Sequence, residues 1–199
     1  MKIASHNSLT FLPVRKWWMK PFAWMARCQQ LTIEQQLQIG VRLFDFRVRF
    51  NGTELIPCHG LIEYKLDNIY DYFRMFDRYK DQIYVRIVLE SRNPNDNQKQ
   101  QFREFCQLIE SVYTCTRFFG GNDRTDWLSE HPLYRFSNPL EDMEHKYASA
   151  TTRFFRGPRW LRYIDDLYPK GYARRYNFKN IVKGTSQKWL MLDFVNIQR

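Results

Sequence analysis

The sequence predicts an α/β fold in the form of a distorted or incomplete TIM (β/α) barrel, built as a single domain over residues 1–199. Strand-like and helix-like segments alternate through the first half of the chain, and polar residues stand at the ends of several strand-like segments. The second half offers too few helix-like segments for a regular barrel. With 44% hydrophobic and 17% aromatic residues, a chain of 199 residues can form one sizeable core.

The individual elements follow from hydrophobic spacing and from the residues at their boundaries. The expected strands are residues 1–5, 41–48, 55–58, 82–90 and 188–196, and the expected helices are 33–39, 67–79 and 95–113. Thr32 is the expected cap of the first helix, and Gly40 ends it. The residues of the last helix that are expected to face the core are Phe102, Phe105, Leu108, Ile109 and Val112. Beyond residue 115 the signals weaken, and the further candidate strands are 116–119, 132–136 and 152–155.

Polar side chains gather at the ends of the expected strands. They are His6, Asp45, Arg47, His59, Glu90 and Asp193. Asp45 and Arg47 are two residues apart, so they share one face of a strand whose earlier residues on that face are apolar. In α/β barrels the chemistry lies at this carboxyl end of the strands. The pattern therefore predicts a site at one rim, with an ion pair that merely closes the barrel end as the alternative for Asp45 and Arg47.

The charge balance and the cysteines restrict the partners. Lysine and arginine exceed aspartate and glutamate by 31 to 21, so the surface should attract phosphates, anionic lipid headgroups or nucleic acid. The four cysteines have no CxxC spacing, which favours reduced thiols in the core over a zinc site or a disulfide framework. We expect a monomer.

The sequence leaves the compartment open. No signal peptide is visible, because His6 and Asn7 interrupt the N-terminal segment before any long apolar run. No apolar run approaches the roughly 20 residues that are needed to span a bilayer. The protein is therefore expected to be cytoplasmic, or secreted with its leader absent from this sequence, and peripheral contact with a membrane is compatible with both.

Residues 15–28 suggest such a peripheral contact. This segment interleaves Trp17, Trp18 and Trp24 with lysine and arginine residues, as interfacial segments do. It directly follows the loop of His6, where an enzyme that acts on lipids needs a surface contact. The alternative is a lid that packs its tryptophans on the barrel.

The motifs "SHNSLT", "TIEQQLQIGVRLFDFRV" and "PCHG" resemble, in this order, the catalytic X region of phosphatidylinositol-specific phospholipases C. The resemblance covers His6 to about Glu90 and the terminal "LDF". It implies a fold of the PLC-like phosphodiesterase type and cleavage of a phospholipid or inositol phosphodiester through a cyclic inositol phosphate.

The resemblance also implies roles for five residues. His6 would be the base that takes the proton of the inositol 2-hydroxyl, and His59 the acid that protonates the departing oxygen. Arg47 would hold the phosphoryl oxygens and stabilise the charge that develops in the transition state. Asp45 would orient Arg47 or a ring hydroxyl, and Asp193 would orient His6.

Two further residues bear on metal dependence. Arg47 stands where the calcium-dependent animal enzymes have a second acid, as in the metal-free bacterial enzymes, so the resemblance implies no cofactor. Asn7 matches the calcium-dependent group instead, and Glu90 lies where that group places a ligand. The alternative is therefore a weak Ca²⁺ site at Asn7, Asp45 and Glu90. We assign Asn7 and Glu90 to substrate binding and expect Glu90 to pair with Arg47.

Other functions remain as alternatives. A glycerophosphodiester phosphodiesterase-like or sphingomyelinase D-like barrel also uses two histidines, but it would need acids for a metal where Arg47 stands. A catalytically silent membrane- or nucleic-acid-binding module is the rival from another class, because residues 154–163 and 170–176 place aromatic side chains beside arginines. A basic rim around an anionic substrate explains these two segments equally well, so we expect no nucleic-acid partner. His131 and His145 are expected to be structural or exposed.

Overall fold

The structure is a computed structural model and describes residues 2–91, 94–123, 143–146, 169–183 and 189–197. Its elements are β1 (Lys2–Ser5), η1 (Ser8–Phe11), η2 (Trp17–Phe22), α1 (Ala23–Ala26), α2 (Ile33–Gln38), β2 (Leu43–Asn51), β3 (Glu54–His59), β4 (Ile62–Glu63), α3 (Tyr70–Asp77), β5 (Tyr84–Leu89), α4 (Asp96–Val112), β6 (Arg117–Asp123), β7 (Met143–Lys146), α6 (Pro169–Lys183) and β8 (Trp189–Leu192). The candidate strands at 132–136 and 152–155, the basic segment at 154–163 and His131 lie outside the described residues.

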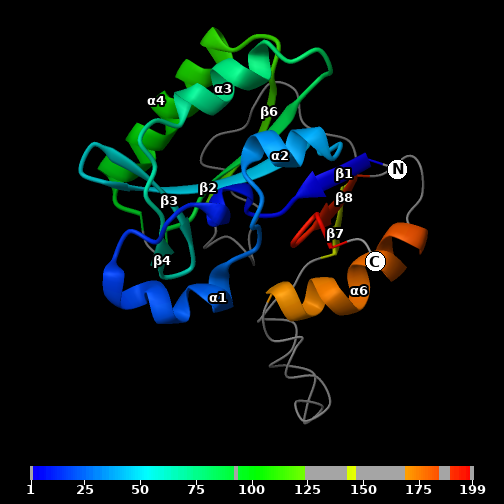
Figure 1. Cartoon of the computed structure of the whole chain (residues 1–199). Coiled ribbons are helices and arrows are strands. Elements are labelled where there is room, and N and C mark those ends of the chain that lie inside the picture. Colours follow the sequence, from blue (N-terminus) through cyan, green and yellow to red (C-terminus); the bar gives the residue numbers. More distant parts are fainter. Residues whose placement is uncertain (1, 92–93, 124–142, 147–168, 184–188, 198–199) are drawn as a thin grey trace.

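One mixed sheet organises the molecule (Figure 1). The strands β7, β8, β1, β2, β5 and β6 lie side by side in this order, and all of these neighbours are parallel. The hairpin of β3 and β4 adds to the second half of β2 in antiparallel fashion. Among the described strands none joins β6 to β7, so the barrel is open there. A distorted or incomplete barrel was expected, and this sheet has that form.

The alternation along β2 separates the core from the site. Phe44, Phe46 and Val48 face a large core that α2, α3 and α4 cover, where the rings of Phe44 and Phe76 stack with centroids 4.8 Å apart. Leu43 points to the other side and belongs to a small cluster with side chains from β1, β6 and β8. Because side chains alternate along a strand, the face of Leu43 is also that of Asp45 and Arg47, as the sequence predicts.

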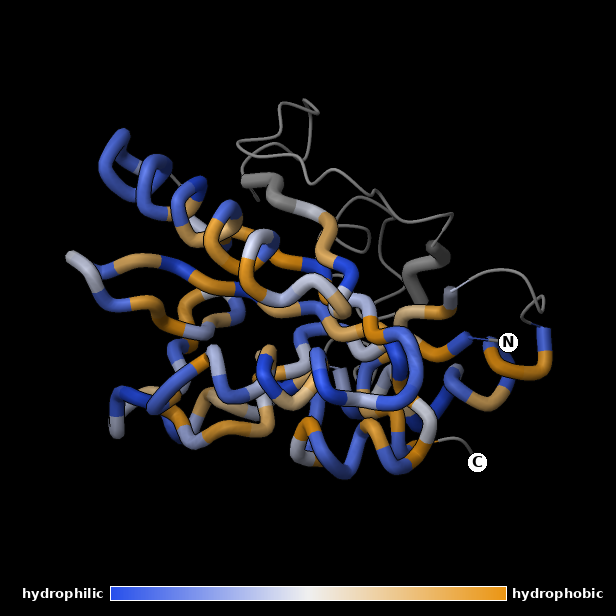
Figure 2. The backbone as a smooth tube through the Cα atoms, turned by 90° about the horizontal axis from the view of Figure 1, so that it is seen from above, coloured by the Kyte–Doolittle hydropathy of each residue, from blue (hydrophilic) through white to orange (hydrophobic). Residues whose placement is uncertain are grey.

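The helices that cover the sheet show mixed hydropathy. In Figure 2 hydrophobic and hydrophilic residues alternate along the helices, as is typical of helices with one face toward a core. The expected first helix is confirmed, because Thr32 and Gln35 form a capping box at its start. In α4, however, the expectation for two residues is wrong. Leu108 is 48% and Val112 54% exposed, whereas the buried residues of this helix are Phe102, Phe105, Cys106 and Ile109.

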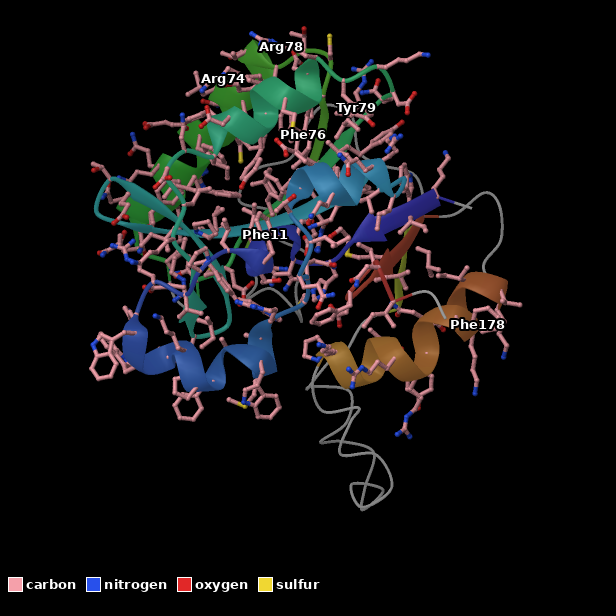
Figure 3. All side chains as sticks on the ribbon, viewed as in Figure 1. Phe11, Arg74, Phe76, Arg78, Tyr79 and Phe178 are labelled. Atoms are coloured by element: carbon pink, nitrogen blue, oxygen red, sulfur yellow. The ribbon has the colours of Figure 1, made fainter. Side chains whose placement is uncertain are left out.

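The helix α6 has no counterpart among the expected elements. Residues 170–176, interpreted from the sequence as part of a basic rim, lie within its first half. It contacts α1 and β8, and Figure 1 shows α6 and α1 at the same end of the molecule. Phe178, which Figure 3 labels on α6, is 56% exposed. None of the helices in the described parts of the chain combines the length and the apolar character that a membrane span requires.

Candidate active site

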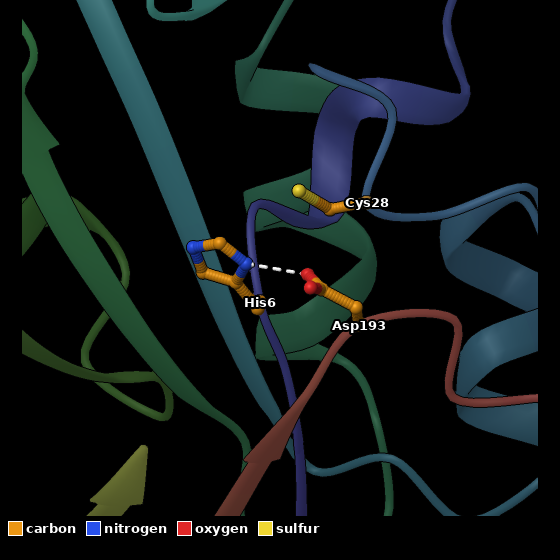
Figure 4. Close-up of side chains that lie close together, drawn as sticks. All are labelled: His6, Cys28 and Asp193. Atoms are coloured by element: carbon orange, nitrogen blue, oxygen red, sulfur yellow. Dashed lines mark hydrogen bonds and ion pairs between the residues drawn. The ribbon is translucent and has the colours of Figure 1, made fainter. Parts of the chain in front are cut away.

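The ends of β1 and β8 place His6 beside Asp193. The two strands are parallel with Ser5 opposite Leu192, so the residues that follow emerge next to each other at the sheet edge. The backbone N–H of His6 donates to the carbonyl of Leu192 over 2.9 Å. Nδ1 of His6 lies 2.6 Å from Oδ1 of Asp193, and both side chains are buried (Figure 4). The sequence predicts this pair, and the structure brings the two residues together.

Gln29 fixes this pair of strand ends. Its side-chain Nε2 donates to the carbonyls of His6 and Leu192 over 3.0 and 2.9 Å, and its Oε1 accepts from the N–H of Val195 over 3.1 Å. The side chain is fully buried, so these hydrogen bonds are not shared with solvent. Gln29 therefore acts as a positioning residue. No sequence signal distinguishes Gln29 from the other polar residues in or next to residues 15–28.

Arg47 lies at the centre of the site, 7% exposed. Its Nε donates to Oδ2 of Asp45 over 2.9 Å, and its Nη2 lies 2.8 Å from Nε2 of His6. Its Nη1 forms a longer ion pair of 3.6 Å with Oε2 of Glu90. The guanidinium thus lies between two carboxylates and an imidazole. The expected pairing of Glu90 with Arg47 is present in this geometry.

Asp45 is a buried carboxylate that two arginines and one backbone group hold. Besides Arg47, Nη1 of Arg86 donates to its Oδ1 over 3.1 Å, and the N–H of Asn7 donates to its Oδ2 over 3.1 Å. Burial would raise the pKa of Asp45, but the charges of Arg47 and Arg86 outweigh it and hold this pKa well below its usual range. Asp45 therefore stays ionised across the working range of a protein and keeps Arg47 in place.

His6 is neutral at pH 7 in this environment. Burial is the largest influence and lowers its pKa, Asp193 opposes this and Arg47 adds to it, so that the pKa falls from 6.5 to about 4. Arg47 can only donate, so Nε2 of His6 must accept. Nδ1 then carries the hydrogen that Asp193 accepts. This is the tautomer that a general base needs, with its lone pair on the side of Arg47.

His59 reaches the site from a different direction. It ends β3, which is antiparallel to β2, so it comes from a hairpin and not from a parallel barrel strand. Its Nδ1 lies 2.6 Å from the carbonyl oxygen of Ala26 and therefore carries a hydrogen, because a carbonyl can only accept. The rings of His59 and His6 have centroids 5.7 Å apart at an interplanar angle of 85°. The structure thus brings the two histidines together.

Glu90 and Gly60 link the hairpin to the centre. The N–H of Gly60, which has a φ of +59°, donates to Oε1 of Glu90, and the N–H of Glu90 donates to the carbonyl of Val48 over 2.7 Å. Gly60 tolerates this left-handed conformation because it has no Cβ. One carboxylate therefore holds the turn after His59 and faces Arg47, which fixes the hairpin that carries His59 relative to the guanidinium.

Asn7 is buried in a left-handed conformation with a φ of 46°. Its backbone contacts Asp45, as described, but its side-chain Nδ2 has no hydrogen-bond partner among the described residues. Buried polar atoms are satisfied in most native structures, so such an atom points to a function or to a bound group. The position of Asn7 beside Asp45 is compatible with its assignment to substrate binding.

The alternative Ca²⁺ site does not fit these residues. Calcium takes six to eight oxygen ligands, roughly, in a flexible shell. The oxygens of Asp45 already accept from two guanidinium groups and a backbone N–H, and the cationic Arg47 lies between Asp45 and Glu90. A cation placed there would meet Arg47 at close range. In the described part of the chain, three side chains with metal-binding atoms come together elsewhere, at His6, Cys28 and Asp193, whose ligand atoms lie within 4.8 Å.

Cys28 is a site residue that the sequence reasoning missed. It is fully buried, and its Sγ lies 3.3 Å from Nδ1 of His59, while Figure 4 shows its sulfur beside His6 and Asp193. Burial, followed by the negative charge of Asp193, raises the pKa of its thiol well above the usual value. A single cysteine without a spacing motif gives no signal. Its position at the end of the aromatic segment is all that the sequence offers.

Comparisons with known proteins support the fold. The sequence matches no family model and no curated protein. The chain is similar in structure to a phosphatidylinositol-specific phospholipase C from Listeria monocytogenes, with a TM-score of 0.64 and 16% identity over 99% of this chain and 89% of that one. It is also similar to the phosphatidylinositol-specific phospholipase C of S. aureus, with a TM-score of 0.59 and 14% identity over 97% and 85% of the two chains. The chain therefore has the α/β fold of these phospholipase C structures, with the open, distorted sheet that the sequence predicts.

Proposed function

We propose that the protein is a phosphodiesterase of the phosphatidylinositol-specific phospholipase C type, which cleaves a phosphoinositide-like phosphodiester by general acid and base catalysis. One observation carries the proposal. The imidazoles of His6 and His59 have centroids 5.7 Å apart at the strand ends of this fold, and Nη2 of Arg47 lies 2.8 Å from Nε2 of His6. A positioned base, a positioned acid and a bidentate donor are the groups that intramolecular phosphoryl transfer requires.

In this proposal His6 takes the proton of the inositol 2-hydroxyl on Nε2. The hydroxyl oxygen attacks phosphorus, the bond from phosphorus to the glycerol oxygen breaks, and a cyclic inositol phosphate forms. Asp193, 2.6 Å from Nδ1, stabilises the imidazolium that results. His59 acts in this step as the imidazolium: its Nδ1–H is held by the carbonyl of Ala26, and its Nε2 gives a proton to the departing glycerol oxygen, which leaves a neutral imidazole.

Arg47 exchanges partners in this scheme. At rest its Nη2 donates to Nε2 of His6. When the phosphate enters, its oxygens compete for the guanidinium, which leaves Nε2 available for the substrate hydroxyl. The negative charge of the phosphate also raises the pKa of His6 toward the range of an effective base. Asp45 and Glu90 keep Arg47 in reach during this exchange, so its positive charge can replace a metal ion.

The membrane contact is the second part of the proposal. Trp17, Trp18, Phe22, Trp24 and Met25, here called the aromatic surface, are between 48% and 74% exposed, which argues against a lid packed on the barrel. Large exposed apolar patches mark membrane or protein contacts. Next to this surface, Arg15 forms a bidentate ion pair with Glu54, and Val14 forms an isolated β-bridge with Tyr64. These contacts tie the segment to the hairpin that carries His59. We infer a peripheral membrane surface beside the active site.

The test of the chemistry uses a water-soluble inositol phosphodiester, followed by ³¹P NMR in excess chelator. Wild-type protein should produce a five-membered cyclic phosphate, and His6→Ala and His59→Ala should lower the rate by about 10²-fold or more each. Lys80→Gln, an exposed change after α3, is the matched control and should leave the rate unchanged. Loss of activity in chelator, or an acyclic product from the start, would favour the metal-dependent glycerophosphodiesterase-like alternative.

The test of the interface separates docking from chemistry. Trp17→Ala and Trp18→Ala should lower sedimentation with phospholipid vesicles, because their rings no longer enter the headgroup region. Hydrolysis of the water-soluble substrate should remain at the level of the wild type. Equal losses in both assays would instead make the segment a structural part of the active site.

A further inference from the structure

A cavity of about 530 Å³ lies between the aromatic surface and the first turn of α6. Its charged lining residues are Lys20, Arg27 and Lys170, and the residues that line it include no acid. Trp24 forms part of its wall and also belongs to the aromatic surface, while Phe194 closes another side. The size falls in the range of small-molecule sites. The cavity thus adjoins the proposed membrane surface through Trp24 and has only basic residues among its charged lining.

The three cations have no counter-charge in the described part of the chain. None of them has an acidic partner within 4.0 Å among the described residues, although acids pair with many other basic side chains of this protein. Nε of Arg27 is buried and has no hydrogen-bond partner among these residues. A buried donor on a charged group is costly when it stays unsatisfied. An anion between the three side chains would remove this cost and the mutual repulsion.

The cavity is separate from the proposed active site but shares its walls. None of His6, Arg47 and His59 lines it. Arg27 directly precedes Cys28 in the chain, and Phe194 directly follows Asp193, so both are neighbours of site residues. The N–H of Phe194 donates to the carbonyl of Cys28 over 2.6 Å, which holds the two walls together. An occupant of the cavity would therefore bind outside the proposed active site and would not compete with its substrate.

We propose that this cavity is a second, non-catalytic anion site, which takes the phosphate group of an anionic membrane lipid. Guanidinium and ammonium groups bind phosphate through charge-assisted hydrogen bonds. Free phosphate has the same chemistry, but Trp24 belongs both to the wall of the cavity and to the aromatic surface, which favours a lipid headgroup. This orientation toward a membrane rests on the proposed membrane contact. The site would add selection for anionic lipid to the unspecific insertion of aromatic rings.

The experiment compares vesicle binding of full-length variants. Lys20→Gln and Lys170→Gln remove exposed or half-buried cations of the cavity, Arg27→Gln removes the central one, and Lys80→Gln is the control with the same charge change far from the cavity. Sedimentation is measured with vesicles of phosphatidylcholine alone and of phosphatidylcholine with phosphatidylglycerol. Each cavity variant should lose binding to the anionic vesicles by about tenfold, against about twofold or less for Lys80→Gln. Binding to neutral vesicles should not change.

Competing results are distinguishable. Equal losses for cavity and control variants would overturn the site, because net charge alone would then explain binding. Saturable binding of inorganic phosphate that depends on Lys20 and Lys170, without any difference between the vesicles, would overturn the lipid assignment. Lys20→Gln and Lys170→Gln carry the test if Arg27→Gln fails to fold. Hydrolysis of the water-soluble substrate should persist in these variants, so a failure of the proposed chemistry would show in that assay and not in sedimentation.

Discussion

Nη2 of Arg47 lies 2.8 Å from Nε2 of His6, so the guanidinium occupies the lone pair that the proposed base would use. This contact fixes the tautomer of His6 and, together with burial, keeps the imidazole neutral. In the proposed mechanism, Nε2 of His6 becomes available to the substrate only when an anion draws Arg47 away. Substrate binding and activation of the base would then depend on the same side chain.

Replacement of Arg47 by lysine should therefore be severe. A lysine keeps the charge but lacks the planar fork that contacts Asp45 and His6 at the same time and that, in the proposed mechanism, exchanges His6 for a phosphate. We expect kcat/KM for the water-soluble substrate to fall by about 10² to 10³-fold. Arg42→Lys is the matched control, because Arg42 pairs with the exposed Asp81, and its activity should stay within about twofold of the wild type. Equal activities of the two variants would remove Arg47 from the mechanism.

Asp193→Asn should test the pairing of His6. An asparagine can offer its NH₂ group to Nδ1 and so favour the wrong tautomer of the imidazole, while the shape of the site is kept. We expect kcat to fall by about 10³ to 10⁴-fold with little change in KM. A merely structural role would predict lower thermal stability with normal kcat in the folded fraction, and this result would contradict the assignment.

The stability of the protein should decline on mild acidification because of His6. Its pKa is about 4 in the folded chain and 6.5 as the reference value, so the unfolded chain binds the extra proton between these values. The contribution of neutral His6 to the free energy of unfolding is therefore fully present above about pH 6.5, and it is lost as the pH falls toward 4. At about pH 5 the loss is about 2 kcal/mol in the free energy of unfolding. Urea unfolding at pH 7 and 5 measures it, and His6→Gln should show a smaller drop between the two conditions than the wild type.

The four cysteines should differ sharply in reactivity. Cys115 is exposed, whereas Cys28, Cys58 and Cys106 are buried and free. Burial raises the pKa of Cys28, so its thiol stays protonated although it lies beside two histidines. We expect an aromatic disulfide reagent to titrate one thiol rapidly in the native chain and four after denaturation. Cys115→Ser should abolish the rapid phase, whereas a rapid phase that persists and inactivates the protein would show Cys28 to be accessible.

Strong periodicity explains what the sequence could predict. The helices α2, α3 and α4 and the strands β1, β2, β5 and β8 were all expected close to their observed positions. In β2, alternation alone separates the core residues from Asp45 and Arg47. The pairing of His6 with Asp193 followed from the family resemblance, since the two lie at opposite ends of the chain and no local pattern joins them.

Other features lack such a signal. The buried residues of α6 are Pro169, Gly171, Ala173 and Asn177, whereas Phe178 and Val182 are exposed, so no apolar period marks this helix. Leu108 lies to one side of the face that Phe105 and Ile109 turn to the core, and the helical spacing alone did not resolve this. The antiparallel hairpin of β3, which brings His59 to the site, depends on pairing with β2 that single-strand patterns do not reveal.

Ala26 is the last residue of α1, and its carbonyl oxygen accepts the hydrogen bond of Nδ1 of His59. A short helix at the surface, which also bears Trp24, thereby sets the orientation of the proposed proton donor. A shift of α1 would move this acceptor and with it the orientation of the imidazole of His59. If α1 attaches to a surface as proposed, a displacement of this helix would be passed on to the imidazole of His59, so the placement of the proposed proton donor would depend on how the protein lies on that surface.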